Sequence, residues 1–281
     1  LLQTNNSTLS DYYAMHFKDF NEDMQDFVEK VTIEARIKNS QVHSDDITFF
    51  APTLKTWNKK FDLSGKMLGT VSKFKIDDLF LRNGPVTYIS GNLAMKGLPD
   101  IDNTWIDFGN GFIQTNSKEI AFIYPDIAKI TNPDLLALGN IRYKGNFSGT
   151  INNFNIDGTL SSVLGGLTTK LNLQLPANGL PAYDGEVTTT QFDLGKFMDV
   201  PSIGKVSFNG KINGKGFELN NAFSSLDGVF NLLEFNGYTY NNLHFTGSIQ
   251  KQKFNGDFKA NDPNFDFTSF IEIDLSGDQP K

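Results

Sequence analysis

Glycine and large apolar residues fall together at alternate positions along much of this 281-residue chain, with small polar residues between them. For example, Tyr143, Gly145 and Phe147 alternate with Lys144 and Asn146. Because successive side chains of a β-strand point to opposite faces, this spacing predicts strands with one apolar and one polar face. The pattern recurs in residues 63–71, 154–160, 208–214, 245–249 and 254–258, and without the glycine in 171–175 and 271–275.

The glycines on the apolar face indicate a curved sheet. A glycine within a strand usually costs stability and marks a bend or a close approach of the backbone. Here glycine removes a side chain from the same face in strand after strand, so the sheet can curl without clashes and space remains between bulky residues. The 26 phenylalanines, which have no polar atom to satisfy, predict an unusually apolar face.

Turn residues indicate meandering hairpins. Asn-Gly or Asp-Gly occurs between strand signals at 213–214, 227–228 and 236–237. We therefore predict a mainly β protein, built as a curved antiparallel sheet with one or two short helices. From the residues alone, the apolar face is either the closed core of a sandwich or barrel, or an open hydrophobic groove. A transmembrane barrel is a third alternative, but the aromatic girdles expected at its strand ends are missing.

Two segments favour helices. Apolar residues in 10–30 recur at helical spacing behind Ser10 as a candidate N-cap, although residues 13–17 also fit a strand. A shorter helix is predicted at 132–139, with Pro133 at its first position and a terminal glycine as the stop signal.

The chain is expected to consist of a lead-in and two continuous sheet segments. Residues 1–30 form the lead-in, as a helix or an edge strand, and residues 31–140 and 141–281 form the first and second β groove segments. Pro- and Gly-rich stretches near 96–102 and 176–181 predict loops or subdomain boundaries.

Composition excludes several classes of partner and chemistry. The formal net charge is −7 and Lys and Arg are scattered, so we expect no nucleic-acid partner and no direct docking to an anionic membrane surface. Without Cys, thiol catalysis, disulfides and thiolate metal sites are excluded. No run approaches the roughly 18 apolar residues of a membrane span. The first residues do not resemble a signal peptide, so we expect a segment of a longer protein whose membrane anchor lies outside it.

The titratable residues predict no catalytic or metal site. His16, His43 and His244 lie far apart in the sequence and lack metal-type spacing. The adjacent carboxylates at 45–46 and at 77–78 would face opposite ways on a strand, so they cannot share a proton. General acid–base catalysis is therefore not expected.

The remaining polar motifs are interpreted as structural. The oxygen-rich turns at 100–103 and 261–264 lack the spacing of an EF-hand loop and fit Asx turns. Glu272 and Asp274 share the polar face of a strand and suggest a solvated edge. The glycines of 210–216 lie within a strand pattern rather than at a strand-to-helix turn, so they are no nucleotide-binding fingerprint. We predict no enzyme activity and no cofactor.

Several stretches together resemble a known family. The strongest runs from 237–243 (GYTYNNL) through 254–258 (FNGDF) to 261–264 (NDPN). Others are 141–151 (IRYKGNFSGTI), 192–196 (FDLGK) followed by 204–206 (GKV), 49–52 (FFAP) and 97–101 (GLPDI). In order and breadth these stretches, which extend from about residue 30 to the end, resemble the TamB family of the AsmA-like superfamily of Gram-negative bacteria.

The resemblance implies an architecture and a function. Members of this family are long periplasmic proteins with an N-terminal inner-membrane anchor and a C-terminal region that engages an outer-membrane barrel protein of the BamA/TamA type. Their body is a half-open, taco-like β groove lined with apolar residues. The resemblance therefore implies phospholipid transport between inner and outer membranes, or support for the assembly or secretion of outer-membrane barrel proteins through open strand edges. No oligomer is expected.

Physical chemistry is consistent with a lipid groove. At about 0.8 kcal/mol per methylene, exposing one acyl chain of about sixteen carbons to water costs on the order of 12 kcal/mol. A continuous apolar trough without fixed polar anchors would lower that barrier and bind chains without holding one pose. The residues predicted to line the groove are Leu63, Met67, Val71, Tyr143, Phe147, Ile151, Phe208, Ile212, Phe245, Ile249, Phe254 and Phe258.

Overall fold

The computed structural model describes residues 2–48, 57–218, 220–274 and 276, and it is mainly β, with 63% strand and 14% helix. The predicted fold class is confirmed at this level: the strands are antiparallel, the sheet is open, and the helices are short. The motif at 49–52 and Leu275, in the predicted strand 271–275, lie outside the described residues. The chain divides into two compact units, Leu1–Ile123 with Arg142–Ile151, and Tyr124–Ile141 with Asn152–Lys281.

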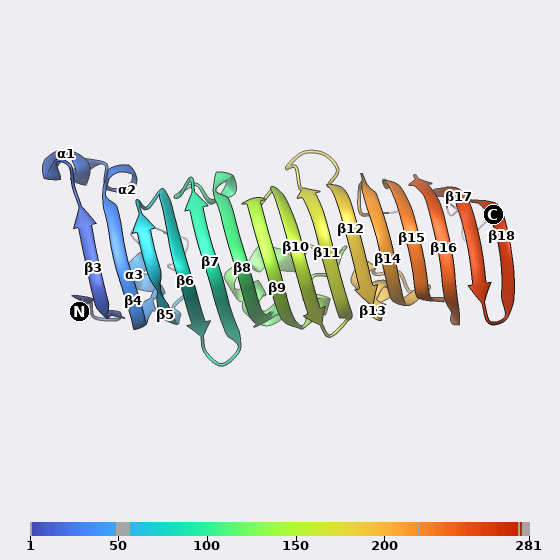
Figure 1. Cartoon of the computed structure of the whole chain (residues 1–281), viewed down its shortest axis with the longest axis horizontal. Coiled ribbons are helices and arrows are strands. Elements are labelled where there is room, and N and C mark those ends of the chain that lie inside the picture. Colours follow the sequence, from blue (N-terminus) through green and yellow to red (C-terminus); the bar gives the residue numbers. More distant parts are fainter. Residues whose placement is uncertain (1, 49–56, 219, 275, 277–281) are drawn as a thin grey trace. The chain divides into compact units, whose positions relative to one another are not determined.

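The first unit is an antiparallel meander in which β3 to β8 pair in chain order (Figure 1). Its strands are β1 (Leu2–Gln3), β2 (Thr8–Leu9), β3 (Asp11–His16), β4 (Thr32–His43), β5 (Lys60–Gly69), β6 (Lys73–Asn83), β7 (Thr87–Lys96), β8 (Trp105–Asn116) and all but the first two residues of β9 (Asn140–Thr150). Its helices are α1 (Phe20–Gln25), α2 (Phe27–Lys30), α3 (Ser44–Ile47), η2 (Ile101–Asn103) and α4 (Ser117–Ile123).

The second unit is also an antiparallel meander (Figure 1). Antiparallel pairing runs from β10 through β11, β12 and β14 to β18, and the short β13 pairs with β14. Its strands are β10 (Asn153–Ser162), β11 (Gly165–Gln174), β12 (Ala182–Thr190), β13 (Phe192–Asp193), β14 (Ile203–Lys215), β15 (Phe223–Phe235), β16 (Tyr238–Gln250), β17 (Lys253–Asp262) and β18 (Phe265–Asp274). Its helices are η3 (Pro125–Lys129), η4 (Leu136–Leu138) and α5 (Leu194–Met198).

The lead-in contains both structures that its sequence suggested. β3 occupies the start of residues 10–30, and α1 and α2 follow it. Ser10 is not the N-cap. Instead, the carboxylate of Asp19 accepts hydrogen bonds from the backbone N–H groups of Asn21 and Glu22 at 2.9 and 3.0 Å. β3 ends at His16, and α1 begins at Phe20, directly after the N-cap Asp19.

The helix predicted at 132–139 is wrong in type and start. Only the three-residue 3-10 helix η4 forms, and Thr131 and Asp134 make an isolated β-bridge around Pro133. The carboxylate of Asp134 accepts from the N–H groups two and three residues ahead, at 3.0 and 3.1 Å, and so replaces the predicted cap. Gly139, at φ 61°, ends the helix as expected.

Of the three predicted Gly turns, only Asn236–Gly237 is one. Both residues have positive φ, 48° and 80°, and they join Phe235 directly to its partner Tyr238, as a type I′ turn does. Residues 213–214 and 227–228 instead lie within β14 and β15. The loops expected near 96–102 and 176–181 do separate β7 from β8 and β11 from β12.

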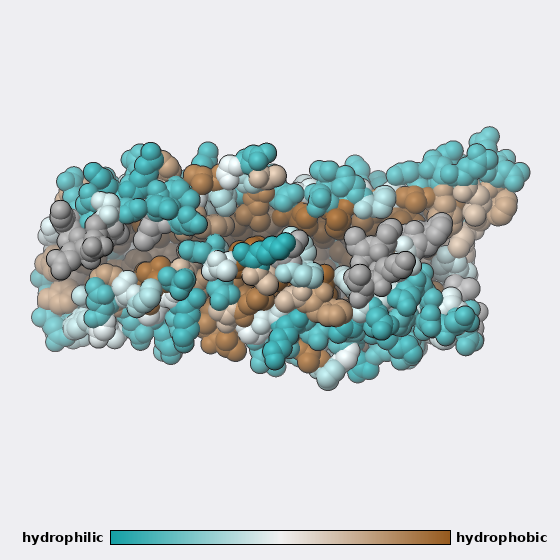
Figure 2. Space-filling view, turned by 180° about the vertical axis from the view of Figure 1, so that it is seen from behind, coloured by the Kyte–Doolittle hydropathy of each residue, from teal (hydrophilic) through white to brown (hydrophobic). Residues whose placement is uncertain are grey.

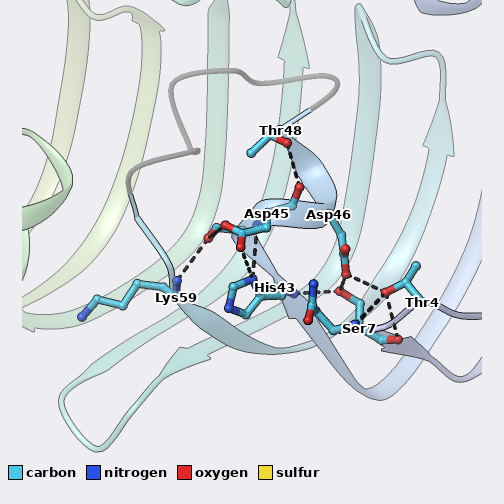
Figure 3. A network of polar contacts seen from close by, with 9 residues as sticks. Thr4, Ser7, His43, Asp45, Asp46, Thr48 and Lys59 are labelled. Atoms are coloured by element: carbon cyan, nitrogen blue, oxygen red, sulfur yellow. Dashed lines mark hydrogen bonds and ion pairs between the residues drawn. The ribbon is translucent and has the colours of Figure 1, made fainter.

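The carboxylates Asp45 and Asp46 lie on α3, so their predicted placement on a strand is wrong. Figure 3 shows them in a polar network that ties α3 to the N-terminal segment. Asp46 accepts a hydrogen bond from Thr4 Oγ1 at 2.6 Å and another from Ser7 Oγ, and these bonds, Ser7's first, lower its pKa. Asp45 donates its backbone N–H to His43 Nδ1 at 3.3 Å.

Asp77 and Asp78 do not face opposite ways, because β6 has a bulge between Ile76 and Leu79. Asp78, at φ 55°, accepts a bond from Lys66 Nζ at 2.9 Å. The hydrogen bond and charge of Asp78, followed by the charge of Asp77, raise the pKa of Lys66. Both carboxylates therefore act on one exposed lysine of the polar face.

Of the two Asp-rich turns, only the second is an Asx turn as predicted, whereas the first is the N-cap of η2. In the first, Asp100 accepts from the backbone and side-chain nitrogens of Asn103 at 3.4 and 2.8 Å. In the second, the buried Asp262 accepts from the N–H groups of Asn264 and Asn241 at 3.0 and 2.8 Å and from Tyr238 Oη at 3.2 Å. These bonds, led by that of Asn264, hold the pKa of Asp262 below its usual value.

Acid is expected to destabilise the second unit through Asp262. Because its folded-state pKa is depressed, its contribution is present above the unfolded pKa and is lost as the pH falls through the folded value. Asp262→Asn should lower the melting temperature at pH 7 and show less of the acid-induced decrease. Asp266→Asn, an exposed change on β18, is the control. Identical pH profiles for wild type and Asp262→Asn would contradict this assignment.

Candidate functional site

The apolar residues of the second unit form rows that cross the sheet from strand to strand. Register places each member of a row directly opposite the next, on the same face. One row is Ile156, Leu171, Gly185, Ile212, Leu226, Gly247, Gly256 and Ile271. The next is Phe154, Leu173, Tyr183, Gly214, Ser224, Ile249, Phe254 and Ile273. Neither row contains a charged residue.

Phenylalanine rings lie directly over glycines of this face. A Cβ added at Gly210 or Gly228 would lie 2.5 or 2.6 Å from the ring of Phe208. The Cβ built on Gly210 would also lie 2.7 Å from the Cα of Gly228. The backbones of β14 and β15 therefore approach too closely on this face to leave room for a side chain at either glycine. The space that the sequence predicted beside the glycines is therefore filled by rings lying along the sheet.

The same arrangement recurs in both units. In the second, the ring of Phe245 covers Gly247 and Gly256, which are direct cross-strand partners. In the first, the ring of Phe108 lies against the positions that a Cβ would take at Gly91 and Gly111. In the sequence this arrangement corresponds to the Phe-x-Gly spacing of 208–210 and 245–247.

The apolar face of the second unit is buried toward one end of its strands. Phe208, Leu243, Phe245 and Ala260 are buried. Beyond them the side chains of this face are more exposed: Ile212, Leu226, Ile249 and Phe254 are half-buried. Figure 2 shows apolar surface between hydrophilic margins in the part of this face that it draws.

The short helix α5 packs against β14 at the buried end. The rings of Phe192 and Phe197 meet edge to face at 5.3 Å there, and the backbone N–H of Asp134 donates to the carbonyl of Phe197 at 2.7 Å. The segment that precedes η4, together with α5, therefore covers this end of the face. The described strands all belong to one sheet, so none of them is assigned to a second layer over the rest.

The structure distributes the twelve predicted lining residues over three environments. Tyr143, Phe208 and Phe245 are buried, and the hydroxyl of Tyr143 donates to the carbonyl of Asn146 at 2.8 Å. Val71 and Ile151 lie just beyond the ends of β5 and β9, so the predicted strand alternation does not extend to them. The half-buried members are Leu63, Met67, Phe147, Ile212, Ile249, Phe254 and Phe258.

The corresponding face of the first unit has its own row, Ala35, Met67, Ile76, Leu93 and Phe108. Its register is interrupted by bulges in the pairings of β4 with β5 and of β5 with β6. Because the bulges shift the register, Leu63 pairs with Ser40 on β4 and with Leu81 on β6. It does not pair with the residues that an unshifted register would place opposite it. Bulges increase local twist and bend the strand.

Chemically, the apolar face offers contact area rather than reacting groups. Two of the three histidines have carboxylate neighbours, His16 with Glu34 at 3.3 Å and His43 with Asp45 at 3.5 Å. Over the described ranges, no three His, Asp or Glu side chains gather as a metal site would require. Within the same ranges, no helix has the length and apolar character to cross a membrane.

Comparisons with protein-family models, with curated proteins and with solved structures give no match for this chain.

Proposed function

We propose that this chain is a segment of a periplasmic bridge, anchored in the inner membrane elsewhere in the protein, whose apolar face forms a half-open groove that conducts phospholipid between the membranes. The observation that carries the proposal is the pair of uncharged rows on β10 to β18, whose larger members are half-buried rather than closed under a second layer. Isolated apolar residues on a surface are ordinary, but a contiguous apolar patch marks an interaction site.

The chemistry of the rows suits an acyl chain. Each methylene that leaves water on such a face gains about 0.8 kcal/mol, which rewards a long hydrocarbon in proportion to its length. The rows present Ile, Leu, Phe and Gly with few polar groups, so successive positions along them are nearly equivalent. A chain can therefore shift along the face without breaking directional bonds, as conduction requires.

The direct test is the lipid content of the purified protein. We expect phospholipid in an organic extract of the chain, identified by mass spectrometry, and displacement of a spin-labelled phospholipid from the apolar face by unlabelled lipid. Protein purified without detergent and found free of lipid, with no immobilised spin-label signal after mixing, would contradict the proposal.

A second candidate function is a scaffold for the assembly or secretion of outer-membrane barrel proteins. Its supporting observation is β18, which in the described part of the chain pairs only with β17 and carries Phe267 at 43% exposure. An open strand edge can accept an extended segment by β-augmentation. Crosslinks from photoreactive residues on β18 to a client barrel, without crosslinks from Leu226 to lipid, would favour this function over lipid conduction.

A further inference from the structure

The outer, polar face of the first unit contains a depression of about 610 Å³ with an unusual lining. The lining includes two exposed large apolar side chains, Trp105 at 50% exposure and Leu68 at 47%. Lys73, Lys75 and Lys96 lie around them. The composition of the chain gave no sign of a basic cluster, because the pairing of β6 with β7 brings Lys96 to the two lysines of β6.

Two of the lysines are direct cross-strand partners. Lys73 pairs with Lys96, and Lys96 pairs on its other side with Trp105. Like charges directly opposite one another destabilise a sheet. Lys75 has an ion pair with Asp77 at 3.4 Å, but neither Lys73 nor Lys96 has one in the described part of the chain. In the described residues, no direct ion pair therefore relieves the repulsion between Lys73 and Lys96.

Two further carboxylates line the depression, those of Glu29 and Asp107, but neither forms an ion pair with Lys73 or Lys96 in the described residues. The carboxylate of Glu29 already accepts a hydrogen bond from Ser72 Oγ at 2.7 Å. An anion placed between the two unpaired ammonium groups would convert their repulsion into two charge-assisted hydrogen bonds.

We propose that this depression binds a phosphate-bearing ligand, with the phosphate between Lys73 and Lys96 and an apolar or ring portion lying on Trp105 and Leu68. The apolar floor excludes a bare inorganic anion as the best ligand, since Trp105 and Leu68 would then gain nothing. The ligand is either a phospholipid headgroup in a bilayer or a soluble phosphate ester. The site lies on the first unit, on the face opposite that unit's own apolar row, and does not depend on the function proposed for the rows of the second unit.

Trp105 provides a local readout. The chain has 2 Trp, so Trp57→Phe leaves Trp105 as the sole indole. In this background we expect monomeric dihexanoyl phosphatidylglycerol to change Trp105 fluorescence saturably, with inorganic phosphate competing weakly. Lys96→Gln and Lys73→Gln should each weaken binding by about tenfold and, by relieving the repulsion, raise the melting temperature of the ligand-free protein. Lys144→Gln, an exposed change on β9, should alter neither.

Vesicles distinguish the two sources of the ligand. If vesicles of phosphatidylglycerol in phosphatidylcholine change the fluorescence and the monomer competes, the ligand is a bilayer headgroup. If only the monomer binds, it is a soluble phosphate ester. The proposal is overturned if no phosphate-bearing probe alters Trp105 fluorescence, or if Lys144→Gln weakens binding as much as Lys96→Gln.

Discussion

Phe245→Ala is expected to lower the free energy of unfolding of the second unit by about 3–5 kcal/mol, the usual cost of truncating a buried phenylalanine. Phe245 is 2% exposed, and its ring stacks on that of Phe254 with centroids 4.3 Å apart. It also covers Gly247 and Gly256, which have no side chain with which to refill the space. The cavity left by the ring would therefore border backbone on two strands, which limits its collapse.

The measurement is denaturant unfolding followed by circular dichroism, with intrinsic fluorescence as an internal reference, because Trp57 and Trp105 both lie in the first unit. Phe270→Ala is the matched control: Phe270 is 61% exposed on the polar face of β18, and its truncation should cost less than about 0.5 kcal/mol. Equal losses for the two variants would show that the ring of Phe245 does not cover the glycines in solution.

The alternation in the sequence determined which residues share a face but not where each strand ends. In β14, Phe208, Gly210 and Ile212 do share a face, because a period of two leaves no other arrangement. The Asn-Gly dipeptides show the limit. Asn213–Gly214 pairs within the sheet, whereas Asn236–Gly237 turns the chain. Asn and Gly tolerate a positive φ at either dipeptide, so residue type alone does not identify the turn. The register of the neighbouring strands decides which dipeptide forms it.

Features that depend on pairing between distant strands were beyond reach of the sequence. Lys73 and Lys96 are separated by a whole hairpin, and only the register of β6 with β7 makes them neighbours. The bulge in β6 likewise reversed the expected placement of Asp78. A one-residue change of register moves every side chain to the other face, so such contacts cannot be derived from periodicity alone.

Leu226→Asp is expected to weaken acyl-chain binding by at least about tenfold while leaving the sheet folded. Leu226 lies at the middle of its row, between Ile212 and Gly247, and it is half-buried, so a carboxylate there can still reach water. The substitution removes apolar contact worth roughly 0.8 kcal/mol per methylene and requires the bound chain to pass an ionised group. Binding of a spin-labelled phospholipid to the purified chain measures the loss.

Ser225→Asp is the control that distinguishes the effect of an added charge from the effect of its position on the apolar face. Ser225 directly precedes Leu226 on β15 and faces the polar side, between Asn213 and Ser248. The substitution adds the same charge to the same strand, so this variant should bind lipid as wild type does. Ile249→Asp, in the next row, should reproduce the effect of Leu226→Asp, which guards against a defect confined to one position. Crosslinking from β18 should be unaffected by all three substitutions, since none of them lies on that edge. Lipid binding that survives in both Leu226→Asp and Ile249→Asp would mean that the rows are an ordinary packed surface, and the strand edge would then be the better candidate for the functional site.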